Sequence, residues 1–205
     1  MSNILLVTSS PRGQASHSSR LAGELAESLQ RSRPGSRVVR RDLAAQPLPH
    51  IDGHFAGGIG TPEAERSEAQ QRAVAASDAA VDELLAADTL VIAAGIINFG
   101  VPSTLKAWLD NVARAGRTFR YGEAGPEGLA GGRKAYLVVA SGGVYSEGPA
   151  APLDHAVPYL KTILGFIGIT DVEVIRIEGV ALGPEAEQAA LTRAADALSA
   201  LAVAA

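Results

Sequence analysis

Short apolar runs alternate along this chain with longer segments in which apolar residues recur every three or four positions. Residues 4–7 and 89–94 (TLVIAA) form the clearest runs, and residues 135–140 (AYLVVA) and 172–179 (VEVIRIEG) form two more. Uninterrupted apolar runs of this length are typical of strands buried on both faces. A fifth run, SRVVRRDL around Val38, is shorter and more polar. The pattern predicts four buried strands and one edge strand.

Between these runs, apolar side chains follow helical spacing. Three segments carry such a stripe: Leu21, Leu25 and Leu29; Val81, Leu84 and Leu85; and Leu105, Trp108, Leu109 and Val112. Two helix starts are predicted where proline takes the first helical position with acids in the first turn, at Thr61-Pro62-Glu63 and Gly183-Pro184-Glu185. Strands that alternate with helices pair in parallel through right-handed crossovers. The sequence therefore predicts an α/β fold with a doubly wound parallel sheet.

Two stretches do not fit this alternation. Residues 44–60 (AAQPLPHIDGHFAGGIG) contain too much proline and glycine for a regular element and are predicted to form a long loop. The segment TFRYGEAGPEGLAGG, from Thr118, is predicted to leave the sheet briefly, with a turn at Gly125-Pro126.

Composition narrows the class of protein. With 205 residues and 47% hydrophobic content, the chain is expected to form one domain over residues 1–205. Cysteine is absent and the formal charge is −4, with arginines scattered along the chain, so neither disulfides nor a nucleic-acid partner is expected. No apolar stretch approaches the length that spans a bilayer, and no basic-then-apolar signal opens the chain. We expect a cytoplasmic protein without membrane contact.

In open parallel sheets, ligands bind beyond the carboxyl ends of the strands, so the loops in those places decide function. Three such loops are rich in glycine or serine: TSSPRGQASHSS after the first strand, GIINFGVPS at residues 95–103 and ASGGVYSEG at residues 140–148. They are expected to converge at one edge of the sheet.

The first loop suits a phosphate. A helix N-terminus offers unpaired N–H groups and partial positive charge, and serine hydroxyls add donors. The candidate ligands are Ser10, Ser16, His17 and Ser18. The alternative is a helix N-cap within a serine-rich turn, which needs only one of these hydroxyls.

The other two loops suit a flat ring attached to that phosphate. Ile97 and Phe99 offer apolar contact, and the amide of Asn98 both donates and accepts. Glycines at 100, 142 and 143 let the backbone approach a ring edge, as the alternating donors and acceptors of a flavin require. Taken singly, each loop is equally compatible with a plain turn.

Other nucleotide and catalytic motifs are missing. There is no G-x-G-x-x-G after the first strand, no phosphate-binding G-x-x-x-x-G-K-[ST] and no G-x-S-x-G. A dinucleotide held in the Rossmann manner and an α/β-hydrolase nucleophile are therefore not expected. His50 and His54 have metal-like spacing but no evident third ligand, so no metal site is predicted.

Seven stretches together resemble the FMN-dependent NADH-azoreductase family of the flavodoxin-like fold, whose members also reduce quinones. They are SSPRGQASHS, DLAAQPLP, INF, VARAGRTFRY, GPEGL, SGG and LGFIGITDV, and the similarity runs along nearly the whole chain. The resemblance implies five parallel strands in the order 2-1-3-4-5, with helices on both faces.

The resemblance also implies a site. FMN would be held by Ser10 and the Ser16-His17-Ser18 segment, with Ile96, Ile97, Asn98 and Phe99 and the Ala140, Ser141, Gly142 and Gly143 segment bordering its ring. NADH or NADPH would deliver a hydride to the flavin, and a quinone or azo compound would then take two electrons at the same place. No side chain is an obligatory acid or base, since the cofactor carries the chemistry. Phe119, Tyr121 and Tyr145 are candidates for the substrate side, with ordinary packing the alternative for Phe119.

A homodimer is also implied, with each flavin near the subunit interface, where the apolar ILGFIGI segment from Ile163 fits either the interface or the core. The chain departs from the common family pattern at Gly95, Ile97, Ser141 and Tyr145, where proline, tyrosine, arginine and histidine are frequent. These changes touch the substrate side, so substrate preference is the property they affect. Two other hypotheses stand beside the reductase: a flavodoxin-type electron carrier and a flavin-free scaffold.

Overall fold

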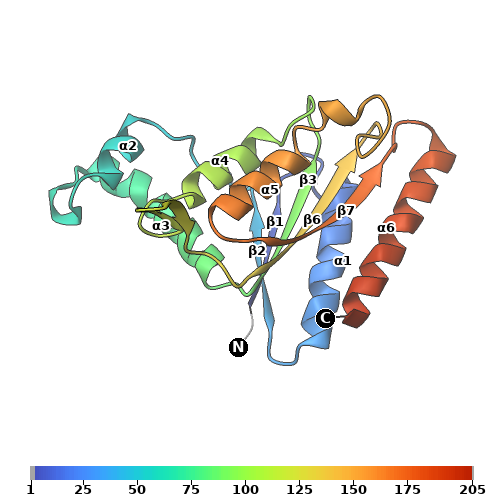
Figure 1. Ribbon diagram of the computed structural model, residues 1–205, viewed down its shortest axis with the longest axis horizontal. Helices are drawn as coiled ribbons and strands as arrows, with labels where there is room; N and C mark the ends of the chain where they lie inside the picture. The colour runs from blue at the N-terminus through green and yellow to red at the C-terminus, as the bar shows by residue number, and fades with distance from the viewer. Residues whose placement is uncertain (1–2, 205) are drawn as a thin grey trace.

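The computed structural model of the protein describes residues 3–204, and a five-stranded parallel sheet runs through its centre (Figure 1). The strands are β1 (Asn3–Thr8), β2 (Arg37–Asp42), β3 (Thr89–Gly95), β6 (Lys134–Ser141) and β7 (Asp171–Glu178). Their order is β2-β1-β3-β6-β7, and all four pairings are parallel. Counted along the sheet strands alone, this is the predicted order 2-1-3-4-5. The more polar β2 lies at one edge, as its sequence predicted. β7 lies at the other edge and is only partly buried, so the prediction of a fourth fully buried strand is wrong.

Helices cover both faces of the sheet (Figure 1). One layer consists of α1 (His17–Ser32) and α6 (Pro184–Ala204), and the other of α3 (Glu68–Leu85), α4 (Ser103–Val112) and α5 (Val157–Phe166). Each predicted apolar stripe faces the sheet: Leu21, Leu25 and Leu29 are at most 1% exposed. Since Pro184 is the first residue of α6, that predicted helix start is confirmed.

The predicted loop over residues 44–60 is wrong in its second half, because α2 (Gly53–Ile59) forms there. The carboxylate of Asp52 accepts a hydrogen bond from the N–H of Phe55 at 2.8 Å and so caps this helix. A Cβ on Gly58 would lie 2.8 Å from Cγ2 of Val74 on α3. Glycine thus lets α2 pack closely on α3, and this packing outweighs the low helix propensity of the segment.

The predicted helix start at Thr61-Pro62-Glu63 is also wrong. Pro62 caps only a short 3-10 turn, Glu63–Glu65, and α3 begins at Glu68. A capping box decides the position: the Ser67 hydroxyl accepts from the N–H of Gln70, and the Gln70 side chain accepts from the N–H of Ser67. Two satisfied N–H groups stabilise a helix start more than proline alone.

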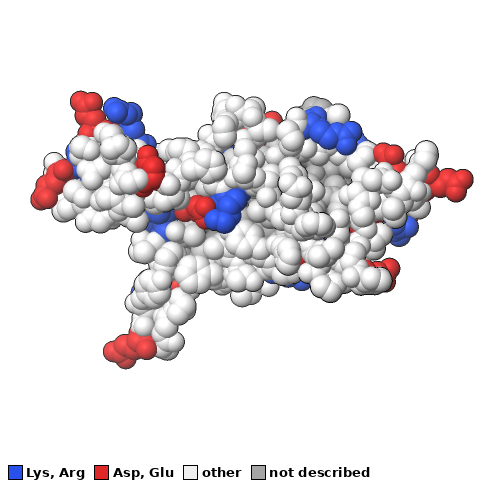
Figure 2. All heavy atoms as spheres, turned by 90° about the horizontal axis from the view of Figure 1, so that it is seen from above, with Lys and Arg blue, Asp and Glu red and all other residues white. Residues whose placement is uncertain are grey.

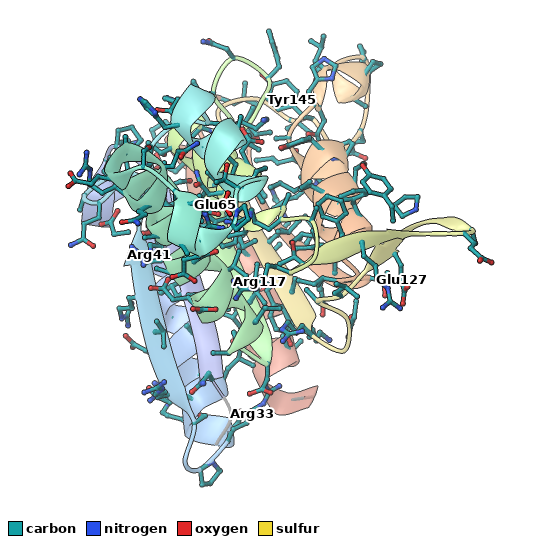
Figure 3. The ribbon with its side chains drawn as sticks, turned by 90° about the vertical axis from the view of Figure 1, so that its left-hand side faces the viewer. Arg33, Arg41, Glu65, Arg117, Glu127 and Tyr145 are labelled. Atoms are coloured by element: carbon teal, nitrogen blue, oxygen red, sulfur yellow. The ribbon has the colours of Figure 1, made fainter. Side chains whose placement is uncertain are left out.

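The predicted excursion after Thr118 is a hairpin of β4 (Phe119–Gly122) and β5 (Gly125–Gly128), which projects from the body of the molecule and carries Glu127 (Figure 3). Its turn falls at Glu123 and Ala124, not at the predicted Gly125-Pro126. Pro126 lies within β5, where a residue without an N–H is tolerated because a two-stranded ribbon has only edge strands.

Candidate functional site

Three loops meet at the carboxyl ends of β1, β3 and β6 and enclose a cavity of about 210 Å³. Viewed from above Figure 1, the charged side chains lie mainly around the periphery of the molecule, and the surface between them is largely uncharged (Figure 2). The cavity is lined by Ser10, Pro11, Arg12, Ser16, His17, Ser18, Gly95, Ile96, Ile97, Pro102, Ala140, Ser141, Gly142 and Val180. The expected convergence of the three loops is therefore present.

The first wall of the cavity is the N-terminus of α1. Ser16 caps the helix, since its hydroxyl accepts from the N–H of Ser19 at 3.4 Å, and it lies 3.1 Å from the hydroxyl of Ser18. The hydroxyl of Ser10 accepts from the N–H of Arg12 at 3.2 Å. The capping alternative thus accounts for Ser16 alone. The hydroxyl of Ser10 only accepts in its contact with Arg12 and so retains a proton to donate, whereas the Ser18 hydroxyl shares one contact with Ser16 in which either oxygen could be the donor.

His17 lies in this wall, but its side chain has a partner on another helix. Nε2 of His17 lies 2.9 Å from Oε1 of Glu187 on α6. The N–H groups of His17 and Ser18 belong to the first turn of α1 and therefore have no acceptor within the helix. At this position the backbone, more than the imidazole, is suited to bind an anion.

Arg12 gives the cavity its charge. It is the only lysine or arginine among the lining residues that the structure describes, and no aspartate or glutamate is among them. Within residues 3–204, Arg12 has no ion-pair partner. An unpaired guanidinium, serine hydroxyls and free N–H groups together form a donor-rich end that suits a phosphate.

The second wall follows β3. Ile97 and Gly100 exchange two backbone hydrogen bonds of 3.0 Å, with Asn98 and Phe99 between them at φ values of 48° and 70°. These are the features of a tight turn with two left-handed residues. Asparagine tolerates this conformation, but phenylalanine does so rarely. The turn leaves Ile97 and Phe99 45% and 44% exposed, so it presents apolar surface beside the cavity.

The third wall follows β6. The hydroxyl of Ser141 donates to the carbonyl of Gly143 at 2.7 Å, which closes the loop on itself. Three backbone hydrogen bonds tie residues 141–143 to residues 179–181 after β7. Ser141 therefore supports the loop and brings no charge to this wall, and the cation of the cavity comes from Arg12 on the first wall.

Some predicted residues lie beside the cavity or away from it. Asn98, Phe99, Gly143 and Tyr145 are not among the lining residues. Phe99 and Tyr145 form an edge-to-face ring pair with centroids 6.1 Å apart next to the second and third walls. In the hairpin, Phe119 packs on Phe166 at a centroid distance of 4.5 Å, and Tyr121 is 76% exposed. Phe119 and Tyr121 therefore do not line this cavity.

Four lining residues were missed by sequence reasoning: Pro11, Arg12, Pro102 and Val180. Arg12 stands within the serine-rich loop and was detectable as the single charge in it. Val180 follows β7, and its place in the lining depends on the backbone bond from its N–H to the carbonyl of Ser141 at 3.3 Å. No pattern in the neighbouring sequence predicts that contact.

Histidines 50 and 54 have no further ligands nearby. Among residues 3–204, the structure has no group of three or more His, Cys, Asp or Glu side chains that could hold a metal ion.

A doubly wound parallel sheet of this strand order, with a donor-rich helix N-terminus at the carboxyl ends of its strands, is typical of the flavodoxin-like class of nucleotide-binding proteins. The sequence profile of the flavodoxin-like fold matches residues 2–202. The chain belongs to this family, in the group that contains the FMN-dependent NADH-azoreductases and quinone reductases.

Several relatives show how similar the chain is to that group. An FMN-dependent NADH:quinone oxidoreductase of Rhizobium johnstonii is 59% identical over 205 residues, which is all of both chains. One of Mesorhizobium japonicum is 58% identical over 192 residues, 94% of this chain and 91% of that relative. The solved azoreductase of Bacillus anthracis str. Sterne has a TM-score of 0.91 and 32% identity, covering 98% of this chain and 99% of its own.

A second solved structure bears on the ligand. It is an FMN-dependent NADH-azoreductase of Bacillus anthracis str. Ames Ancestor in complex with FMN, with a TM-score of 0.88 and 27% identity over 98% of this chain and 100% of its own. The residues present in our structure fit that group. The donor-rich end suits a phosphate, and a Cβ on Gly95 would meet nothing within 4 Å, so the floor beside Ile96 is open to a flat ring.

Proposed function

We propose that this chain is an FMN-dependent NADH:quinone oxidoreductase that also reduces aromatic azo compounds. The observation that carries the proposal is the cavity itself, which joins an anion-binding helix N-terminus to a flat wall of backbone and apolar side chains. Relatives with this quinone reductase activity in their names match the chain along its full length. That match favours an enzyme over a flavodoxin-type electron carrier.

Each wall has a proposed role. Ser10, Ser18 and the N–H groups of the first turn of α1 bind the phosphate, and Arg12 adds charge. Residues 95–97 and 140–142 border the ring. When bound, FMN supplies the redox chemistry, accepting a hydride from NADH or NADPH and giving two electrons to the acceptor. The protein orients the reactants, and exposed Ile97 and Phe99 offer apolar surface to a flat acceptor. No side chain is assigned as an acid or base.

We also propose that residues 1–205 form a single FMN-binding domain that works in the cytoplasm, where its nicotinamide coenzyme is supplied, as a homodimer. Exposed Tyr121 (76%), Ile97 (45%) and Leu153 (42%) support association, because large apolar side chains are usually covered in an assembly. Light scattering after gel filtration should give the mass of two chains.

No helix within residues 3–204 has the length and apolarity needed to cross a bilayer.

An anaerobic absorbance experiment tests the activity. The purified protein is loaded with FMN, then NADH is added, followed by a benzoquinone. The flavin band should bleach with NADH and return with quinone. A bound flavin that NADH cannot bleach would favour the electron carrier, and failure to bind FMN would favour the flavin-free scaffold.

A double variant tests the phosphate site. Ser10→Ala combined with Ser18→Ala removes two hydroxyl donors, and we expect FMN to bind roughly 10- to 100-fold more weakly, since hydrogen bonds to charged groups are the stronger ones. Riboflavin, which lacks the phosphate, should bind both proteins equally. Ser28→Ala, on the same helix α1 and away from the cavity, is the matched control. Unchanged FMN affinity in a fluorescence titration would remove the phosphate assignment.

A further inference from the structure

Three charged side chains form a buried chain of ion pairs beside the cavity without lining it. Arg176 lies between two carboxylates, with Nη2 2.7 Å from Oδ2 of Asp154 and Nη1 3.1 Å from Oε1 of Glu178. The side chains of Asp154 and Glu178 are only 5% and 10% exposed. Charges this far from water are costly unless each has a partner. We call the cluster of Arg176, Asp154 and Glu178 the β7 ion-pair chain. Each of its three charged groups has an oppositely charged partner.

The β7 ion-pair chain attaches both ends of one loop to strand β7. Oε1 of Glu178 accepts from the N–H of Tyr145 at 2.9 Å, and its Oε2 accepts from the hydroxyl of Ser146. Oδ1 of Asp154 accepts from the N–H groups of Ala156 and Val157, both at 3.0 Å, where α5 begins. Because Arg176 and Glu178 are two residues apart on β7, they point to the same face of the sheet. Residues 145–157 are thus fastened to one stretch of that strand.

This loop in turn supports the strained turn of the second wall. The ring of Tyr145, which lies at the end of the molecule opposite Arg33 (Figure 3), packs edge-on against Phe99. The N–H of His155 donates to the carbonyl of Phe99 at 3.0 Å. A bulky residue keeps a φ of 70° only where its surroundings hold it. Tyr145 and His155 supply two of the contacts that hold Phe99.

We propose that Arg176 and Glu178 are positioning residues that hold the Phe99–Tyr145 ring pair at the mouth of the cavity and so set the affinity for flat aromatic acceptors such as quinones. The inference rests on the proposed function. The ring pair adjoins both walls that border the ring: Phe99 follows Ile97 in the same turn, and the Tyr145 hydroxyl lies 3.4 Å from where a Cβ on Gly143 would be. A substrate enters past these rings, whereas FMN phosphate binds at the opposite, serine-rich end.

Steady-state kinetics of the FMN-loaded protein provide the first test. Glu178→Ala removes the acceptor of the Tyr145 N–H and of the Ser146 hydroxyl together with one partner of Arg176, and it should raise KM for a benzoquinone about tenfold with kcat changed less than about twofold. FMN content should stay the same. Glu178→Gln retains an acceptor for the N–H of Tyr145, so its KM should lie between those of the wild-type protein and Glu178→Ala. Glu173→Ala is the matched control, because Glu173 lies on β7 with an exposed partner, Lys134, at 3.3 Å.

Hydrogen exchange provides a readout that does not depend on activity. In Glu178→Ala the amides of Tyr145 and His155 should lose protection, since they donate to Glu178 and to the turn that the loop supports. Glu173→Ala should leave both unchanged. Unchanged exchange of these two amides in Glu178→Ala would overturn the inference, as would an unchanged KM.

A second variant keeps the test decisive if Glu178→Ala folds poorly. Tyr145→Leu leaves the ion-pair chain intact and removes the ring, so it should raise KM for the quinone by a similar factor. In the Tyr145→Leu variant, adding Glu178→Gln should raise KM by less than about a further twofold, because the effects of residues that act through one another are not additive. Full additivity would overturn the inference. Wild-type protein that fails to reduce quinones would instead refute the proposed function, and the exchange experiment would still decide the positioning role.

Discussion

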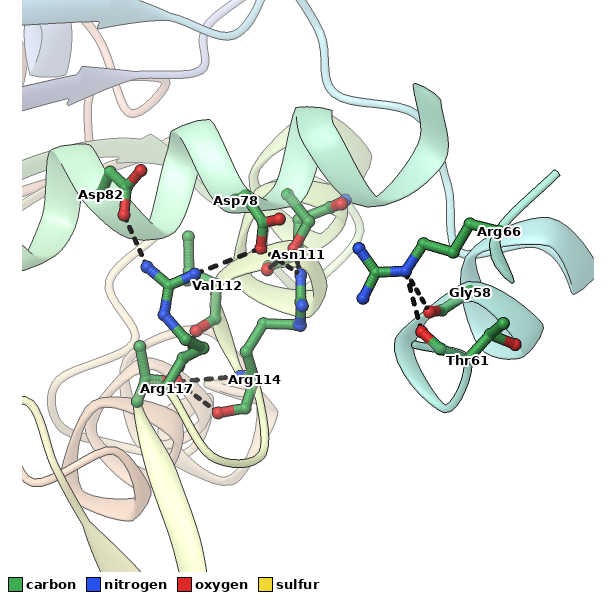
Figure 4. A network of polar contacts seen from close by, with 11 residues as sticks. Gly58, Thr61, Arg66, Asp78, Asp82, Asn111, Val112, Arg114 and Arg117 are labelled. Carbon is green, nitrogen blue, oxygen red and sulfur yellow. Dashed lines mark hydrogen bonds and ion pairs between the residues drawn. The ribbon is translucent and has the colours of Figure 1, made fainter. Parts of the chain in front are cut away.

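Two networks of ion pairs, each built on arginine, differ in the parts of the molecule that they connect. On the helical face, Arg114 and Arg117 join α3 to the end of α4, through Asp78 and Asp82 (Figure 4). At the cavity edge, Arg176 joins β7 to the loop over residues 145–157. The first network connects regular elements, and none of its residues lines the cavity. The second connects a strand to a loop that supports the mouth of the cavity.

The networks also differ in which charge is buried. In the first, Arg114 is 10% exposed, whereas Asp78 is 36% and Asp82 68% exposed. Burial therefore lowers the pKa of Arg114, with Asp78 opposing the shift. In the second, the carboxylates are the buried partners. Burial alone would raise the pKa of Asp154, but hydrogen bonds from Arg176 and from the N–H groups of Val157 and Ala156 outweigh it and lower the pKa.

Arg114 also reaches α2. Its guanidinium lies 5.4 Å from the centroid of the Phe55 ring and donates to the hydroxyl of Ser77 at 2.6 Å. Arg66 makes a second contact with α2, because its Nε donates to the carbonyl of Gly58 at 2.8 Å (Figure 4). The short helix that sequence reasoning missed is thus held by residues of α3, of the segment before it and of the segment after α4. From this comparison we expect loss of the first network to affect stability most, and loss of the second to affect stability less and substrate binding as well.

The largest effect is expected at the centre of the first network. Arg114→Ala should lower the free energy of unfolding by about 2–3 kcal/mol, because it removes a buried side chain that donates to the Ser77 hydroxyl, pairs with Asp78 and packs on the Phe55 ring. Urea unfolding followed by the fluorescence of Trp108, the one tryptophan in the sequence and fully buried, measures it. FMN affinity of the folded variant should not change. Arg117→Gln is the control and should lose less than about 1 kcal/mol, since its pairs are more exposed. Equal losses would contradict the assignment.

A smaller, pH-dependent effect is expected in the second network. Asp154→Asn should cost about 1–2 kcal/mol at pH 7, because asparagine still accepts the two N–H groups but loses the ion pair with Arg176. Since the folded pKa of Asp154 is lowered, its stabilisation is complete above the unfolded pKa and is lost as pH falls through the folded pKa. The difference in stability between the two proteins should therefore begin to shrink as the pH falls below about 4 and should keep shrinking through the lower folded pKa. A constant difference from pH 7 to pH 3 would contradict the ionic contribution.

The smallest effect is expected at an exposed pair. Arg120 and Glu127 lie across the projecting hairpin, 2.7 Å apart and each more than half exposed. Their hydrogen bond lowers the pKa of Glu127 and raises that of Arg120, but water screens the interaction. Arg120→Gln should therefore leave the thermal midpoint unchanged. A shift of more than about 2 °C in calorimetry would show that the hairpin pair acts like the buried networks.

Much of this architecture was predictable from local pattern. The five sheet strands, the stripe of Leu21, Leu25 and Leu29 and the helix start at Pro184 all follow from the spacing of apolar residues and from capping chemistry. Besides the burial of β7, three predictions failed. The α2 helix depends on the packing of Gly58 against Val74, and the start of α3 depends on the capping box of Ser67 and Gln70. The turn of the hairpin falls two residues before the predicted Gly125-Pro126. All three errors lie in or next to the two segments that are rich in proline and glycine.

The candidate site also has features that the sequence predicted and features that only the structure revealed. The sequence by itself determined the alternation of strands and helices and the chemistry of three loops, because period and residue type are local properties and parallel strands bring their carboxyl ends to one edge. Only the tertiary structure decided that His17 pairs with Glu187, that Phe99 takes a left-handed conformation and that Arg176 lies between Asp154 and Glu178. The pairs His17–Glu187 and Arg176–Asp154 join residues far apart in the chain. Their energies depend on burial and distance, which no local pattern encodes.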